Sequence, residues 1–91
     1  MFIQTEETPN PATLKFLPGR DVMGAAPPAD FPNAESAKAS PLAEKLFKIP
    51  QVSSVFLGSD FITITKSEDD WQQLKPLLLT ALMDFFLWGL P

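Results

Sequence analysis

The residues of this sequence that could do chemistry are two small acidic clusters, Glu6-Glu7 and Glu68-Asp69-Asp70. Carboxylate oxygens bind hard cations such as Mg²⁺ and Ca²⁺, and they can act in general acid–base catalysis. Neither cluster has the alternating ligand spacing of a calcium loop. Acidic residues are also favourable at a solvated strand end or at a helix N-terminus. The sequence therefore favours a structural role for both clusters, with a carboxylate-based metal site as the alternative.

Other reactive side chains are missing, because the 91 residues include no cysteine and no histidine. Zinc and iron–sulfur sites depend on thiolate or imidazole ligands, and the usual nucleophilic triads need histidine. The four glycines stand alone and form no phosphate-binding loop. The composition thus argues against an enzyme, and it predicts no catalytic residue, no metal ligand and no cofactor in this chain.

The charge of the chain bears on its partners. A net charge of −4 without any basic cluster disfavours nucleic acid, because an acidic surface repels phosphates. The apolar run near the C-terminus is shorter than the ~20 residues that span a bilayer, so no membrane partner is expected. The first residues resemble neither a secretory signal nor an Arg-rich transit peptide. We therefore expect a cytoplasmic location.

The segment Thr8-Pro9-Asn10-Pro11 predicts a stiff, extended corner between two strands. Each proline fixes its own φ and pushes the preceding residue toward extended backbone. A preordered, exposed segment loses little entropy on binding, so the corner is also a candidate recognition surface. The candidate partner-binding residues are Thr8, Pro9, Asn10, Pro11, Lys15, Leu87 and Trp88.

The last two candidates come from the C-terminal stretch LLLTALMDFFLW, which contains only two polar residues. A helix that packs on one sheet needs a single apolar stripe, and this stretch has more. Burial within the chain, contact with another protein or domain, and self-association could each explain the excess. We expect Met83 and Phe86 to be buried and Leu87, Trp88 and Leu90 to form a contact surface.

Hydrophobic periodicity predicts an α+β fold with the order ββαββα. The expected strands are residues 2–6, 13–17, 52–57 and 61–65, and the expected helices are residues 41–49 and 71–88. A four-stranded antiparallel sheet with both helices packed on one face would bury their apolar stripes. Pro76 should delay the last helix or kink it near its first turn.

The chain is expected to form a single domain, residues 1–91, with two segments outside its regular elements. Residues 20–39 are rich in alanine and proline and are expected to be a long mobile loop. Phe31 would attach this loop to the core, and Asn33 would cap a short helical turn. Residues 86–91 are expected to be an apolar tail or the start of a linker.

Four stretches carry a family resemblance: TPNPATLKFLPG, SPLAEKLF, VFLGSDFITITK and DWQQLKP. In this order, over about residues 2–85, they resemble the N-terminal domain of Nfu/NifU-type iron–sulfur cluster scaffold proteins. The resemblance implies a ββαββα fold and a separate C-terminal NifU-like domain, whose CxxC motif holds the iron–sulfur cluster. It also implies that the N-terminal domain is a ligand-free accessory that assists partner choice or stabilises the assembly. None of the family's cluster ligands has a matching position in this chain.

The resemblance and the composition together predict a non-catalytic interaction domain of an iron–sulfur cluster scaffold or carrier. It would aid cluster assembly or delivery, and its partners would be the C-terminal NifU-like domain or iron–sulfur client and scaffold proteins. One alternative is a carboxylate-based domain that binds iron or another hard cation. Another is a scaffold domain with no function of its own.

Overall fold

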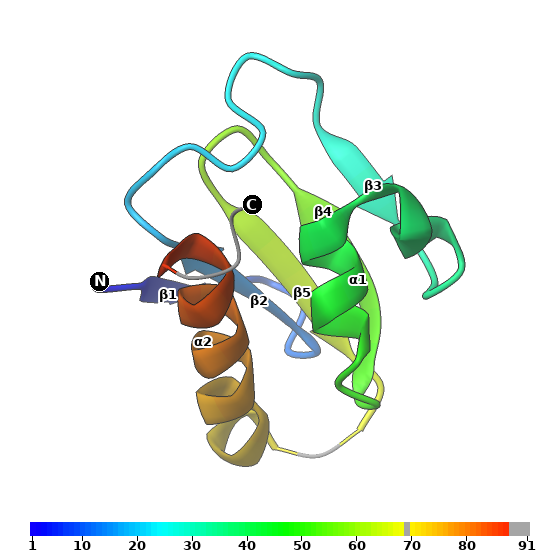
Figure 1. The fold of residues 1–91 in the computed structure, drawn as a ribbon. Helices are drawn as coiled ribbons and strands as arrows, with labels where there is room; N and C mark the ends of the chain where they lie inside the picture. The colour runs from blue at the N-terminus through cyan, green and yellow to red at the C-terminus, as the bar shows by residue number, and fades with distance from the viewer. Residues whose placement is uncertain (69, 88–91) are drawn as a thin grey trace.

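One antiparallel sheet forms the frame of the molecule, as the computed structural model of residues 1–68 and 70–87 shows (Figure 1). Its five strands follow the order β1-β2-β5-β4-β3. They are β1 (Gln4–Glu7), β2 (Thr13–Leu17), β3 (Ala29–Phe31), β4 (Val52–Leu57) and β5 (Ile62–Lys66). The helices are η1 (Ser36–Ala39), a 3₁₀ helix, α1 (Pro41–Phe47) and α2 (Trp71–Leu87). The α+β class and the two α-helices on one face are confirmed.

The sheet has five strands and not the predicted four, because the segment before η1 contributes β3. Ala29 pairs with Leu57 and Phe31 with Val55 at the margin of the sheet. Three residues between two prolines are too short to show a period of two, so the sequence pattern hides this strand. Pairing with β4 and burial of Phe31 create it. Residues 20–39 are therefore partly regular, and Asn33 Oδ1 accepts a hydrogen bond from Ser36 N–H at 2.9 Å, as expected.

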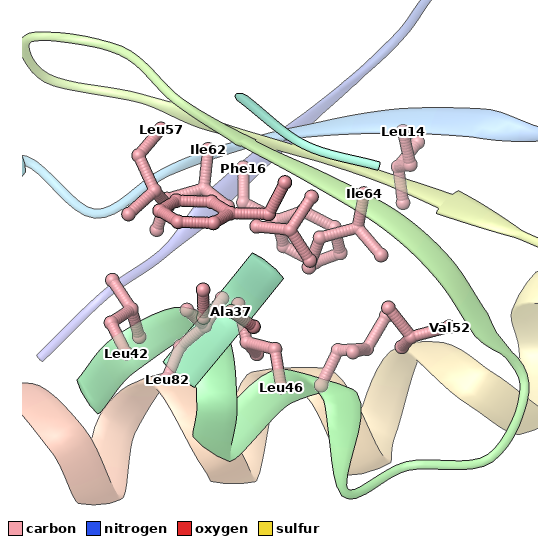
Figure 2. Close-up of a cluster of buried hydrophobic side chains, with 14 of the residues drawn as sticks. Leu14, Phe16, Ala37, Leu42, Leu46, Val52, Leu57, Ile62, Ile64 and Leu82 are labelled. Carbon is pink, nitrogen blue, oxygen red and sulfur yellow. The ribbon is translucent and has the colours of Figure 1, made fainter. Parts of the chain in front are cut away.

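The hydrophobic core lies between the sheet and the two α-helices (Figure 2). Every second residue of the central strands points toward the helices, as the alternation predicts. The fully buried side chains include Phe16, Ile62 and Ile64 from the sheet and Leu46, Leu78 and Leu82 from the helices. Leucines four residues apart on α2 lie on one side of that helix, which fixes it against the sheet.

Local signals set the helix boundaries. Ser40 Oγ accepts a hydrogen bond from Ala43 N–H at 3.2 Å, and Pro41 is the first residue of α1, as predicted. The helix α2 begins at Trp71 and continues through Pro76, so the proline does not delay it. Pro76 is exposed, and the carbonyl group that loses its N–H partner belongs to Gln72, which is exposed too.

The helix α2 ends at Leu87, within the segment 86–91 that the sequence predicts to be an apolar tail. Phe86 is buried, as predicted, and Met83 is half-buried against the core. Leu87, the last residue of α2, is 46% exposed, so the helix extends into the segment expected to be a tail. Trp88 and Leu90, which were expected to join Leu87 in a contact surface, lie outside the described residues.

Candidate functional site

The loop that joins β1 to β2 is held by its own side chains. The Thr8 hydroxyl lies 2.9 Å from the carbonyl oxygens of Asn10 and Thr13, and it accepts a hydrogen bond from Asn10 N–H at 3.2 Å. Asn10 Oδ1 accepts a hydrogen bond from Ala12 N–H at 3.0 Å. Asn10 O accepts another from Thr13 N–H at 2.9 Å. Asparagine and threonine side chains close turns by such local bonds, which order the corner.

The corner is also attached to the first turn of α2 through Trp71. The indole Nε1–H of Trp71 donates a hydrogen bond to Pro11 O at 2.9 Å. Lys66 Nζ lies 5.7 Å from the centroid of the indole ring, within the range of a cation–π contact. Trp71 was not among the candidate residues. Its stretch, DWQQLKP, carries part of the family resemblance, but the bonded carbonyl of Pro11 lies 60 positions away and no local pattern predicts the contact.

An open depression of about 660 Å³ lies between the corner and α2. Thr8, Pro9, Asn10 and Pro11 form one wall, while the other lining residues include Thr5, Glu7, Trp71 and Lys75. We call this feature the corner depression. It offers an aromatic ring, an ammonium group and a carboxylate on a rigid frame, a set of groups suited to binding a protein segment.

The other two described candidates lie elsewhere. Lys15 projects from the face of the sheet opposite the helices, where Nζ lies 3.9 Å from Glu6 Oε1 and 4.6 Å from the centroid of the Phe61 ring. Leu87 ends α2, about 24 Å from Trp71 at 1.5 Å per helical residue. Figure 1 shows the first turn of this helix at the bottom of the molecule and its last turn near mid-height, beside the sheet. The structure therefore gathers residues 8–11 into one site and separates Lys15 and Leu87 from it.

The acidic clusters do not assemble a metal site in the part of the chain that the structure describes. Among those residues, no group of three or more Asp, Glu, His or Cys side chains could hold an ion. Glu6 is paired with Lys15, and Glu7 lines the corner depression. Asp70 uses its carbonyl oxygen to accept hydrogen bonds from the first turn of α2. Asp69 lies outside the described residues. The carboxylate-based alternative thus gains no support from the described geometry.

Comparison with known sequences gives a family match over nearly the whole chain. A family model described as "Scaffold protein Nfu/NifU N terminal" matches residues 3–89. A Drosophila sechellia protein named "NFU1 iron-sulfur cluster scaffold homolog, mitochondrial" is 54% identical over 92 residues, which cover 100% of this chain and 32% of that protein. A Drosophila grimshawi protein of the same name is 54% identical over 99% of this chain and 30% of that protein. The chain spans about a third of the length of these relatives.

Solved structures support the fold. The solution structure of a NifU-like protein from Saccharomyces cerevisiae aligns with a TM-score of 0.81 and 29% identity, over 97% of this chain and 80% of that one. A crystal structure of a Staphylococcus aureus protein aligns with a TM-score of 0.74 over 90% of this chain and 99% of that one. Its 24% identity supports the architecture alone.

The predicted cytoplasmic location is wrong, because the relatives carry the designation mitochondrial. The prediction used the composition of the first residues of this chain. Those residues carry no information about a targeting segment when the chain spans 32% of its relative. Among residues 1–68 and 70–87, no helix has the length and apolar character to cross a membrane.

Proposed function

Because the chain belongs to the Nfu/NifU N-terminal family of scaffold proteins, we propose that it is a non-catalytic interaction domain for iron–sulfur cluster assembly. Its task is to hold a partner protein close to the polypeptide that carries the cluster. Tethering of this kind raises the effective concentration of the partner, which speeds transfer without new chemistry. The mitochondrial designation of the relatives supports a mitochondrial site of action.

The cluster itself belongs, in this proposal, to a separate C-terminal NifU-like domain with a CxxC motif. Iron–sulfur clusters are held mainly by cysteine thiolates, and this chain has no cysteine. The partners are that domain and the client or scaffold proteins that receive or supply the cluster. The chain itself provides a surface that positions a partner protein beside the cluster-carrying domain.

The corner depression is the observation that carries this proposal. Its walls are fixed by the hydrogen bonds of Thr8 and Asn10 and by the bond from Trp71 to Pro11. A binding surface that is rigid beforehand loses little conformational entropy on association. Two prolines and an indole ring present apolar area beside the charged groups of Glu7 and Lys75, a mixture typical of protein interfaces.

Calorimetric titration with two partners tests the proposal. The partners are the C-terminal domain of the full-length Drosophila sechellia relative and one mitochondrial apo-client. We expect at least one of them to bind, and Trp71→Phe to weaken that binding because the indole N–H no longer fixes the corner. Leu87→Ala at the far end of α2 is the matched control and should bind as the wild type does. Absence of binding to both partners would contradict the proposed function.

A further inference from the structure

The strand β1 has one unpaired edge. The strand order places β1 at a margin of the sheet, with β2 on one side and, among residues 1–68 and 70–87, no strand on the other (Figure 1). Three of its four residues, Gln4, Glu6 and Glu7, are exposed. An edge strand of this kind presents unpaired N–H and C=O groups, which can template the addition of another strand.

The alternation of hydrogen bonds in the sheet shows whether the backbone N–H and C=O groups of each β2 residue face β5 or β1. Lys66 N–H donates to Ala12 O at 2.8 Å, so this pair belongs to the bonded set between β2 and β5. Bonded and non-bonded pairs alternate along an antiparallel ladder. Leu14, two residues along β2, therefore turns its N–H and C=O toward β5. Its neighbour Lys15 turns the same groups the other way, toward β1.

The same alternation identifies the free groups on β1. Lys15 pairs with Glu6 in the β1–β2 register, so Glu6 directs its N–H and C=O to β2. Thr5 and Glu7 are the neighbours of Glu6 and direct theirs to the open margin. Thr5 and Glu7 are two residues apart, and each has a backbone donor and acceptor that no described strand uses. This spacing equals the two-residue repeat with which an added strand would form hydrogen bonds.

A groove runs beside these free groups. Thr5 and Lys75 line the corner depression and also a second open depression of about 580 Å³. Phe2, Ile3 and Leu79 line the second one, and Phe2 is 78% exposed. The groove between β1 and α2 therefore offers apolar side chains near the start of β1 together with the polar Thr5 and the charged Lys75.

The acidic residues of β1 determine which kind of strand could bind at its free edge. In the register that sets Thr5 opposite Glu7, two copies of β1 placed edge to edge would bring the Glu6 side chains of both chains together, and each chain already carries a net charge of −4. Self-association through this edge is therefore disfavoured. A strand with lysine or arginine beside Glu6 would instead gain a favourable cross-strand pair. Aliphatic side chains on its other face would contact Ile3 and Leu79.

We propose that the free edge of β1 binds an extended segment of a partner protein as an added strand, with basic residues beside Glu6 and aliphatic residues over Leu79. This inference rests on the proposed interaction role of the chain, and it names the kind of segment that the chain binds. Main-chain hydrogen bonds supply affinity in such strand addition, and alternate side chains supply specificity.

The test uses ¹⁵N-labelled chain and a capped seven-residue peptide in which valine alternates with lysine. We expect shift changes in NMR spectra centred on the amides of Thr5 and Glu7, and slower hydrogen exchange at both. Two N-methylated versions of the peptide carry the methyl groups on alternate residues. One blocks the donors that face β1 and should lose binding, whereas the other blocks the opposite edge and should retain it. A peptide with glutamate in place of lysine should bind more weakly.

A matched pair of variants tests the same contact from the protein side. Thr5→Pro removes one free N–H without touching the ladder to β2, and prolines are tolerated on such edges. It should weaken peptide binding about tenfold, whereas Thr5→Val keeps the N–H and should weaken binding much less than Thr5→Pro does. If Thr5→Pro does not fold, binding of the two N-methylated peptides to the wild-type chain tests strand addition without any protein variant.

Equal binding of the two N-methylated peptides, shifts centred away from β1, or no binding at millimolar peptide would overturn strand addition. The partner titrations of the proposed function are independent of this result. A partner that binds the wild-type chain and the Thr5→Pro variant equally well would leave the interaction role intact and reject the β1 edge alone.

Discussion

The two ends of α2 use similar contacts for different purposes. At the first turn, Trp71 donates a hydrogen bond to the β1–β2 loop at 2.9 Å and lies beside the ammonium group of Lys66. At the last turn, Arg20 donates a longer bond of 3.4 Å to Phe86 O, and its guanidinium carbon lies 5.7 Å from the Phe86 ring centroid. Each end joins an aromatic ring, a cation and a loop from elsewhere in the chain.

The difference lies in where the aromatic ring is placed. Phe86 is buried and completes the core, whereas Trp71 is half-buried and lines the corner depression. The last turn thus contributes mainly to stability. The first turn uses a polar bond to hold the loop beside an open depression.

The largest effect that would separate the two ends is expected from Phe86→Ala. Removing a buried aromatic side chain leaves a cavity and should lower the free energy of unfolding by about 3 kcal/mol. Urea denaturation followed by far-UV circular dichroism measures the change. Leu87→Ala, one residue further and 46% exposed, is the control and should change stability far less. Equal losses in the two variants would contradict the packing described for this end.

An intermediate effect is expected at the corner from Asn10→Ala. The variant removes the oxygen that accepts the bond from Ala12 N–H, which should cost about 1 kcal/mol. Hydrogen exchange of the loop amides should accelerate while that of the core strands is preserved. Asn10→Asp keeps an acceptor oxygen at this position and should behave like the wild type. If Asn10→Asp loosens the loop as much as Asn10→Ala, the side-chain bond is not what orders the corner.

The smallest effect is expected from Arg20→Met, which keeps an apolar stem but loses the bond to Phe86 O. The bond is long and partly solvated, so the loss of stability should be about 0.5 kcal/mol or less. Thermal unfolding compared with the wild type measures it. A loss as large as that of Phe86→Ala would show that the cation, and not burial, secures the last turn.

Much of this frame can be predicted from local patterns. Alternation in ITIT and in TLKFL predicts β5 and β2 because one face of each strand is buried, and Ser40-Pro41 predicts the start of α1. The strand β3 escapes prediction because tertiary pairing, not its three residues, makes it extended. The attachment of Trp71 to Pro11 escapes for the same reason, since it joins segments that only the fold brings together.

The candidate site could be predicted in part. Residues 8–11 were identified from the conformational restriction of proline, which acts locally. Lys15 and Leu87 are also candidate partner-binding residues, but their positions in the sequence do not show whether they lie near the corner in space. In the structure, the pleat sends Lys15 to the opposite face of the sheet, and the length of α2 carries Leu87 away from the corner.

The most direct test of the central claim is an NMR map of the partner surface. It would follow the ¹⁵N amides of the wild-type chain during titration with the C-terminal domain of the Drosophila sechellia relative and, separately, with an apo-client. The account predicts that the largest shift changes with at least one partner lie at residues 5–11 and 71–75. Shift changes confined to the last turn of α2, with the corner unaffected by either partner, would contradict it.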